Sequence, residues 1–130
     1  MTFHWSPDVD DRHELGRRGE ELAARHLKKI GCKVLERNMA NSVGELDLVA
    51  LDGSTVVVVE VKTRSKTIRA PREAVDFRKQ HKLTLTTALF LQSRGWSDRP
   101  VRFDVIEVVC PPGSAPIVNH IKNAFEATTW

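Results

Sequence analysis

The chain has 130 residues, of which 41% are hydrophobic and 28% charged, and this balance is typical of one globular domain rather than a disordered chain. No apolar run approaches the roughly 20 residues of a membrane-spanning helix, and residues 1–16 lack the pattern of a signal peptide, so we expect a cytoplasmic protein without a membrane partner. The net charge of +3 permits binding to a polyanion without demanding it, and two cysteines, Cys32 and Cys110, are too few for a disulfide framework or a zinc site.

A tail and an amphipathic helix are predicted at the start of the chain. Residues 1–12 are predicted to form a flexible N-terminal tail, and residues 13–130 a single domain. Residues 10–31 repeat apolar side chains with the period of an α-helix and carry acids near the start. Gly16 and Gly19 lie in the apolar stripe of that helix, where each glycine costs about 1 kcal/mol relative to alanine. We therefore expect this face of the helix to approach another element closely.

Strands and a second helix are predicted after the first helix. The strands are expected at residues 32–38, 45–51, 55–64 and 101–109, and the long second helix at residues 71–95. Asp52-Gly53 is a strong signal for a two-residue turn between the second and third strands. Residues 115–125 are expected to form a last short strand or turn that leads into a helical tail. This α-β-β-β-α-β order predicts an α/β fold with a mixed β-sheet, flanked by helices on both faces or on one.

Charged residues lie inside the predicted hairpin, where a plain strand carries valine or threonine. If residues 52–53 form the loop, Glu45 lies opposite Glu60. Asp47 then lies opposite Val58 and is a diagonal neighbour of Glu60, roughly 7–8 Å away. Because side chains alternate between the two faces of a strand, the charged residues share one face. That face would hold Glu45, Asp47, Val58, Glu60, Lys62 and Arg64, and the other face Leu46, Leu48, Val57, Val59 and Val61.

The clustered carboxylates of this hairpin predict a cation site. Carboxylates that lie together at low solvent access must protonate, pair with a cation or bind a metal ion. Oxygen ligands without histidine or cysteine favour Mg²⁺ or Mn²⁺, and Lys62 could neutralise the cluster or hold a water beside a metal-bound phosphate. The alternative is a solvated hairpin face, although four consecutive valines before Glu60 indicate burial. Glu20, at the edge of the buried stripe of the first helix, could face the same site.

Two motifs of the hairpin resemble a known active-site signature. GELD at residues 44–47 and VVEVKTR at residues 58–64 are similar to the motifs of the PD-(D/E)XK nuclease superfamily, although Leu46 stands where that name has proline. Six ordered blocks between about residues 16 and 125 resemble the YraN family of small bacterial endonuclease-like proteins. The blocks are GRRGEELAARHLKKIGCKVLERN, GELDLVALDG, VVEVKTR, RKQHKLTLTTALFL, RFDVIEV and HIKNAF. The resemblance implies a restriction-endonuclease-like core, similar to archaeal Holliday junction resolvases.

The resemblance also implies which residues act at the site. The catalytic residues are Asp47, Glu60 and Lys62. The groups that would hold Mg²⁺ or Mn²⁺ are the carboxylates of Asp47, Glu60, Glu20 and Glu45 and the backbone carbonyl of Val61. Glu45 has an alternative, which is an ion pair with Arg64 or Lys62. In the segment NMANSV, residues 38–43, the arginine that the family usually places before its GELD block is missing.

Basic residues follow the EVK motif and would contact a phosphate backbone without reading bases. The predicted nucleic-acid contacts are Arg64, Lys66, Arg69, Arg72, Lys79, Gln80 and Lys82. The alternative is a solvated helix face, balanced in part by Glu73 and Asp76. The implied partner is DNA, branched or otherwise structured, and a homodimer is expected because a resolvase cuts two strands.

Two functions follow from these patterns, and two further residues are assigned structural roles. The first function is a metal-dependent endonuclease that hydrolyses phosphodiester bonds in structured DNA. The second is a non-catalytic nucleic-acid-binding or adaptor protein on a nuclease fold. Asp104 is expected to bind Arg102 or a helix end, and His26 is expected to pack on the buried stripe of the first helix.

Overall fold

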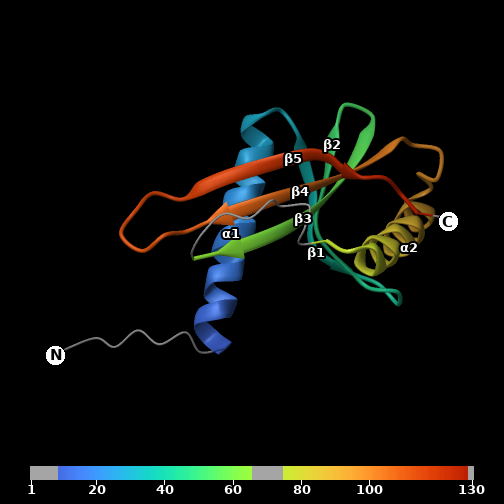
Figure 1. Ribbon diagram of the computed structural model, residues 1–130. Helices are drawn as coiled ribbons and strands as arrows, with labels where there is room; N and C mark the ends of the chain where they lie inside the picture. The colour runs from blue at the N-terminus through green and yellow to red at the C-terminus, as the bar shows by residue number, and fades with distance from the viewer. Residues whose placement is uncertain (1–8, 66–74, 129–130) are drawn as a thin grey trace.

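The structure is a computed structural model that describes residues 9–65 and 75–128, with side chains from residue 13 (Figure 1). The elements, in chain order, are α1 (Val9–Lys29), β1 (Lys33–Ala40), β2 (Glu45–Asp52), β3 (Thr55–Arg64), α2 (Phe77–Arg94), β4 (Val101–Val109) and β5 (Ile117–Phe125). The predicted α/β class is confirmed. Most of the predicted tail lies outside the described residues, so the tail and its boundary stay predictions. Neither described helix is long and apolar enough to cross a membrane.

The sheet has five strands in the order β1-β2-β3-β4-β5, which places β3 at its centre. Neighbouring strands pair antiparallel, apart from β3 and β4, which pair parallel from Val56↔Val101 to Arg64↔Val109. A parallel pair needs a long crossover, and the chain between β3 and β4 supplies one that includes α2. The predicted mixed sheet is therefore confirmed, and the EVK motif lies on its central strand.

The two helices cover opposite faces of the sheet (Figure 1). Ala23 and Leu27 of α1 pack into one buried cluster with Val57 and Val59 of β3. The second cluster joins α2 to the other face, with members that include Leu83, Phe90, Val56 and Val58. Because valines 56–59 alternate between the two clusters, β3 is buried on both faces, which explains its continuous apolar run.

Helix α1 meets β3 at one of the two glycines that the sequence singles out. Gly19 is buried, and a Cβ atom at this position would overlap the side chain of Thr63. Gly16 has no atom within 4 Å of the place where its Cβ would lie. The prediction of a close approach is confirmed for Gly19 and wrong for Gly16.

Helix α2 begins later than predicted. Asp76 is the N-cap, and its carboxylate accepts a hydrogen bond from the Lys79 backbone N–H at 2.9 Å. The helix therefore starts at Phe77, because an aspartate in extended conformation satisfies a free N–H group of the first turn. Residues 71–74 of the predicted helix lie outside the described residues. The predicted end holds, since Gly95 closes the helix in the left-handed conformation with φ of 69°.

The end of the chain differs from the prediction. Ile117–Phe125 forms a strand of nine residues along the outer edge of β4, and residues 126–128 are not helical. The strand is weakly marked in the sequence because an edge strand is half solvated and carries polar residues on both faces. Its ladder with β4 is interrupted between Phe103 and Val105, and Asn123 has φ of 50° in this region. The expected helical tail is therefore wrong.

The register of the β2–β3 hairpin is shifted relative to the prediction. Asp52 pairs with Thr55, so the loop consists of Gly53 and Ser54 rather than of Asp52 and Gly53. Gly53 adopts a positive φ of 61°, which glycine accommodates without strain. The shift moves every pairing by two residues. Side chains that were predicted to share a face still do so along the paired part of the hairpin, because the face of a strand repeats with period two.

Candidate active site

The β2–β3 ladder ends just before the acids of the GELD motif. The last backbone pair at this end is Leu48↔Val59. Beyond it, the Asp47 carboxylate accepts a hydrogen bond from the Val61 N–H at 2.9 Å. Leu46 packs in the α2-side cluster although Leu48 packs in the α1-side cluster, so the alternation of β2 breaks at Asp47. The predicted faces are wrong for Leu46, and the predicted pairing of Glu45 with Glu60 is also wrong.

Glu60 is the buried acid of the site, with 6% of its surface exposed. It follows Val58 on the α2 side of β3, and the first turn of α2 passes over it. The Lys79 ammonium contacts Glu60 Oε1, and the Lys62 ammonium lies 3.7 Å from the same oxygen. Two lysines from different elements therefore converge on one carboxylate, because a buried charge requires a counter-charge.

A cavity of about 430 Å³ opens at this acid. It is lined by Gly44, Glu45, Asp47, Glu60, Lys79, Lys82 and Leu83. Gly44 allows the chain before β2 to approach α2 closely at the cavity wall. A Cβ atom at this position would lie 2.8 Å from Thr86 Oγ1 and 3.2 Å from Lys82 Cε. The cavity therefore brings together the three acids of the β2–β3 hairpin that the sequence predicts and two lysines of α2.

Electrostatics at the cavity oppose the ionisation of Asp47. Burial and the neighbouring Glu60 carboxylate raise the pKa of Asp47 to about 7, and Glu20 adds to this shift. The hydrogen bond from Val61 and the charge of Lys79 act in the opposite direction but do not cancel the shift. The three acids thus lie close enough to oppose one another's charges.

The two lysines of the site have opposite pKa shifts. Burial and the charge of Lys79 lower the pKa of Lys62. Burial also acts to lower the pKa of Lys79, but its hydrogen bond and charge interaction with Glu60 outweigh this effect and raise the pKa. Glu60 therefore favours the charged form of Lys79, whereas burial and Lys79 disfavour the charged form of Lys62.

The predicted metal ligands divide into an inner and an outer group. Asp47 and Glu60 line the cavity, and the N–H of Val61, which follows Glu60 on β3, donates a hydrogen bond to Asp47 on β2. Glu20 lies half-buried on α1, and Glu45 lies exposed at the rim. Within residues 13–65 and 75–128, no three His, Cys, Asp or Glu side chains are arranged as a ready metal-ligand set. The full ligand set thus stays a prediction.

Ion pairs of the basic residues differ from the predicted ones. Arg64 pairs with Glu107 of β4 at 3.0 Å, and Lys62 pairs with Glu60, so neither serves as the alternative partner of Glu45. Glu107 is fully buried, and the sequence analysis missed it because a lone acid in an apolar strand carries no spacing signal.

The predicted nucleic-acid contacts are only partly placed by the structure. Lys66, Arg69 and Arg72 lie outside the described residues. Gln80 donates to the Val75 carbonyl at 2.9 Å, which ties the helix start to the preceding chain. Lys82 is exposed beside the cavity. These contacts stay predictions.

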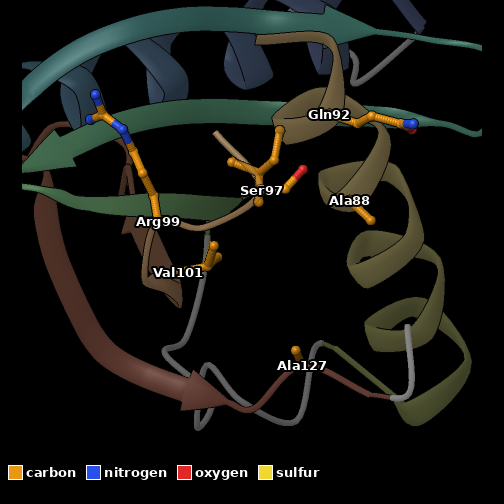
Figure 2. A pocket seen from close by; sticks show the side chains of 7 residues that line it. Ala88, Gln92, Ser97, Arg99, Val101 and Ala127 are labelled. Atoms are coloured by element: carbon orange, nitrogen blue, oxygen red, sulfur yellow. The ribbon is translucent and has the colours of Figure 1, made fainter. Parts of the chain in front are cut away.

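A second cavity, of about 570 Å³, lies on another side of α2 (Figure 2). It is lined by Ala88, Leu91, Gln92, Ser97, Arg99, Val101 and Ala127. Figure 2 shows residues from the end of α2, from the start of β4 and from the chain after β5 around it. The cavity has no acidic lining residue, so it offers no carboxylate to a metal ion.

A second buried acid, Asp104, lies on the α1 side of the sheet. Arg102 donates to it from Nε at 2.9 Å and from Nη2 at 3.1 Å, which confirms the predicted contact. His120 Nε2 lies 2.8 Å from Asp104 Oδ2, and His26 Nε2 lies 3.0 Å from His120 Nδ1. His26 thus packs against the sheet as expected and also joins a polar chain.

Comparisons with known proteins agree with the motifs. A family model described as uncharacterised protein family UPF0102 matches residues 19–108. A UPF0102 protein of Stutzerimonas stutzeri is 50% identical over 121 residues, which cover 92% of this chain and 100% of the relative. A UPF0102 protein of Pseudomonas syringae is 45% identical over 118 residues, covering 89% of this chain and 96% of the relative. A UPF0102 protein of Caldanaerobacter subterraneus is 42% identical over 118 residues, covering 88% and 97%. The chain therefore belongs to the UPF0102 family, which is the YraN family that its sequence motifs indicate.

Proposed function

We propose that the protein is a metal-dependent endonuclease that hydrolyses phosphodiester bonds in structured DNA, in the manner of a junction resolvase. The observation that carries the proposal is the shared cavity of Asp47 and Glu60, which two lysines border. Burial and the neighbouring acids raise the pKa of Asp47 to about 7, and ionising Asp47 in this setting costs free energy that a bound cation would offset.

The donor groups at the cavity fit a hard divalent cation. All of them are oxygens, which Mg²⁺ and Mn²⁺ prefer. The ammonium groups of Lys62 and Lys79 already act as stand-in cations at Glu60. Asp47 and Glu60 would hold the ion, and Glu20 and the Val61 carbonyl would complete its ligands. Bound there, Mg²⁺ or Mn²⁺ would polarise the phosphoryl oxygen and acidify an attacking water.

The remaining residues of the cavity would act on the substrate. Lys62 would orient the water or stabilise the charge that develops on the phosphate. Lys79 and Lys82 would contact the phosphate backbone at the cavity wall, and Glu45 would hold a water at the rim. The basic segment that begins at Arg64 would extend this contact along the DNA. DNA that departs from a plain duplex is the proposed substrate, and two copies of the chain would cut its two strands.

Cleavage of a panel of labelled DNAs tests the proposal. A four-way junction, a flap, a single strand and a plain duplex are incubated with the protein and Mg²⁺, Mn²⁺ or EDTA. Metal-dependent cutting is expected for wild type and is expected to fall by at least about 100-fold in Glu60→Ala and Lys62→Ala. Lys122→Ala, which removes an exposed charge on β5, is the matched control and should cut normally.

The outcomes separate the two candidate functions. Cutting that survives in Glu60→Ala would place the active site elsewhere and contradict the proposal. Salt-sensitive DNA binding without cutting would favour the non-catalytic binding protein, and the ion pair of Lys79 with Glu60 is the observation that supports this second candidate.

A further inference from the structure

We propose that Lys79 is an exchangeable counter-ion that couples the binding of a divalent cation to the binding of a DNA phosphate. This inference rests on the proposed function, because it assigns a regulatory role to a residue of the same site. Lys79 neutralises Glu60 in the free protein. It leaves Glu60 when a divalent cation occupies the carboxylates, and it then binds the phosphate of the substrate.

The contacts of Lys79 give it a fixed backbone and a movable side chain. Its backbone N–H is bound by the N-cap Asp76 at 2.9 Å, so the start of α2 holds its Cα in place. Its side chain is 43% exposed, whereas that of Glu60 is 7% exposed. The lysine can therefore change rotamer without unpacking the core, while the acid stays where β3 places it.

A divalent cation and the Lys79 ammonium compete for the same oxygens. Glu60 is buried, so its carboxylate is reached only through the cavity and the lysines beside it. An ammonium in contact with Glu60 Oε1 repels a second cation and occupies one of its ligand positions. Lys62, at 3.7 Å on the rigid central strand, lies further from that oxygen and can remain beside the ion.

The cavity provides the second position of the lysine. Lys79 and Lys82 lie one turn apart on α2, and both line the cavity of about 430 Å³. An ammonium that leaves Glu60 remains on the wall of this cavity, where a phosphate next to the carboxylates would meet both lysines. Without a cation, Lys79 is committed to Glu60 and the acids repel the phosphate.

This exchange makes the two ligands cooperative. A cation releases Lys79 for the phosphate, and a phosphate that binds Lys79 frees Glu60 for the cation. Linkage requires the two effects to be equal, so the factor by which Mn²⁺ tightens DNA binding must equal the factor by which DNA tightens Mn²⁺ binding. Typical couplings of this kind are about 5- to 150-fold.

Binding measurements on two lysine variants test the coupling. The Mn²⁺ affinity of the full chain is measured by calorimetry with and without a four-way DNA junction, and junction affinity is measured by fluorescence anisotropy with and without Mn²⁺. Gels of the same samples report any cutting during the measurement. Lys79→Met keeps the methylene stem but removes the charge, and Lys82→Met is the matched control on the next turn of the same cavity wall. Circular dichroism and thermal unfolding show that both variants fold.

The expected result is specific to Lys79. Without DNA, Lys79→Met should bind Mn²⁺ about 5-fold or more tightly than wild type. Its coupling factor should fall about 5-fold or more below that of wild type, leaving the direct attraction between the ion and the phosphate. Lys82→Met should bind DNA more weakly but keep the Mn²⁺ affinity and the coupling of wild type.

Two results would overturn the inference, and they differ from failure of the proposed function. If Lys79→Met binds Mn²⁺ no more tightly than wild type, Lys79 is not the competitor of the metal ion. If it keeps the wild-type coupling, another group links the two ligands. If wild type binds no Mn²⁺ at all, the metal site itself fails, and the proposed function falls together with this inference.

Discussion

The sheet carries an aspartate cluster on each face, one around the buried Asp104 and one around the half-buried Asp47, and the two clusters are built in opposite ways. Asp104, on the α1 side, is fully buried and receives hydrogen bonds from Arg102, from His120 and from the Asn123 N–H. Burial alone would raise its pKa, but these hydrogen bonds outweigh that effect and lower the pKa. Asp47 receives one backbone hydrogen bond, and its pKa is raised to about 7 by burial and by Glu60.

This difference separates an acid that stabilises the fold from an acid that is available to a ligand. The donors around Asp104 satisfy both oxygens, so its charge is compensated within the chain. The neighbours of Asp47 include two further carboxylates, so its charge is opposed. Buried polar groups that the fold leaves uncompensated are the ones that a ligand can bind with a gain in stability.

Removal of Asp104 should have the largest effect on stability. Asp104→Ala leaves Arg102 and His120 facing each other without the carboxylate, and loss of one partner of a buried ion pair costs about 3–5 kcal/mol. We expect the free energy of unfolding, measured in urea, to fall by that amount. Cleavage per folded molecule should be unchanged, since Asp104 lies on the α1 side of the sheet and Glu60 on the α2 side. A fall of less than about 1 kcal/mol in the free energy of unfolding would show that Asp104 does not stabilise the fold as proposed.

Replacement of Asp47 should affect stability in the opposite direction. A carboxyl whose pKa is raised on folding binds its proton more tightly in the folded state, so its contribution is fully present below the unfolded pKa and is lost as pH rises through about 7. Asp47→Asn cannot ionise, so it does not lose this stability as the pH rises. At pH 8 without divalent cations the variant should therefore be about 2 kcal/mol more stable than wild type, which is less than the full shift would give because solvent screens this half-buried carboxyl.

The measurement that tests this prediction is the pH dependence of the stability difference between wild type and Asp47→Asn. Thermal unfolding in EDTA from pH 4.5 to pH 8.5 should show the advantage of Asp47→Asn growing up to about pH 7 and then levelling. Asp52→Asn, which alters an exposed acid at the hairpin turn, is the control and should show no such rise between pH 4.5 and 7. An advantage that is constant with pH would mean that the charge of Asp47 is already compensated in the fold.

The smallest predicted effect concerns α1, which contributes to both clusters through Glu20 and His26. Gly19→Ala places a methyl group against Thr63 and should cost about 1–2 kcal/mol, because the helix must move away from β3. Gly16→Ala meets no atom within 4 Å and should instead stabilise the helix by about 0.5–1 kcal/mol. Equal effects of the two substitutions in urea unfolding would contradict the close approach at Gly19.

The sequence was sufficient to predict the fold class and the proximity of Asp47 to Glu60. Four valines before Glu60 indicate a strand buried on both faces, and the structure places that strand at the sheet centre. The two-residue error in register arose because Asp52-Gly53 and Gly53-Ser54 are both acceptable turns, and only the packing of the valines chooses between them. The predicted proximity of Asp47 and Glu60 survives because such a slip preserves the faces.

Contacts between distant segments could not be predicted from the sequence. The ion pair of Lys79 with Glu60 depends on where α2 crosses the sheet, and no local period encodes that crossing. The same holds for Arg64 with Glu107, which joins neighbouring strands that are far apart in the chain. The edge strand β5 was predicted only as a short strand or turn, because its polar side chains resemble those of a loop.

The parallel pairing of β3 with β4 has a consequence for the order of folding. The hairpins β1–β2–β3 and β4–β5 close short loops, whereas the β3–β4 ladder closes the much longer connection between Arg64 and Val101. Asp47 and Glu60 belong to one hairpin, and Lys79 belongs to the slow crossover. Along the folding path, the acidic pair should therefore form before its lysine counter-ion arrives.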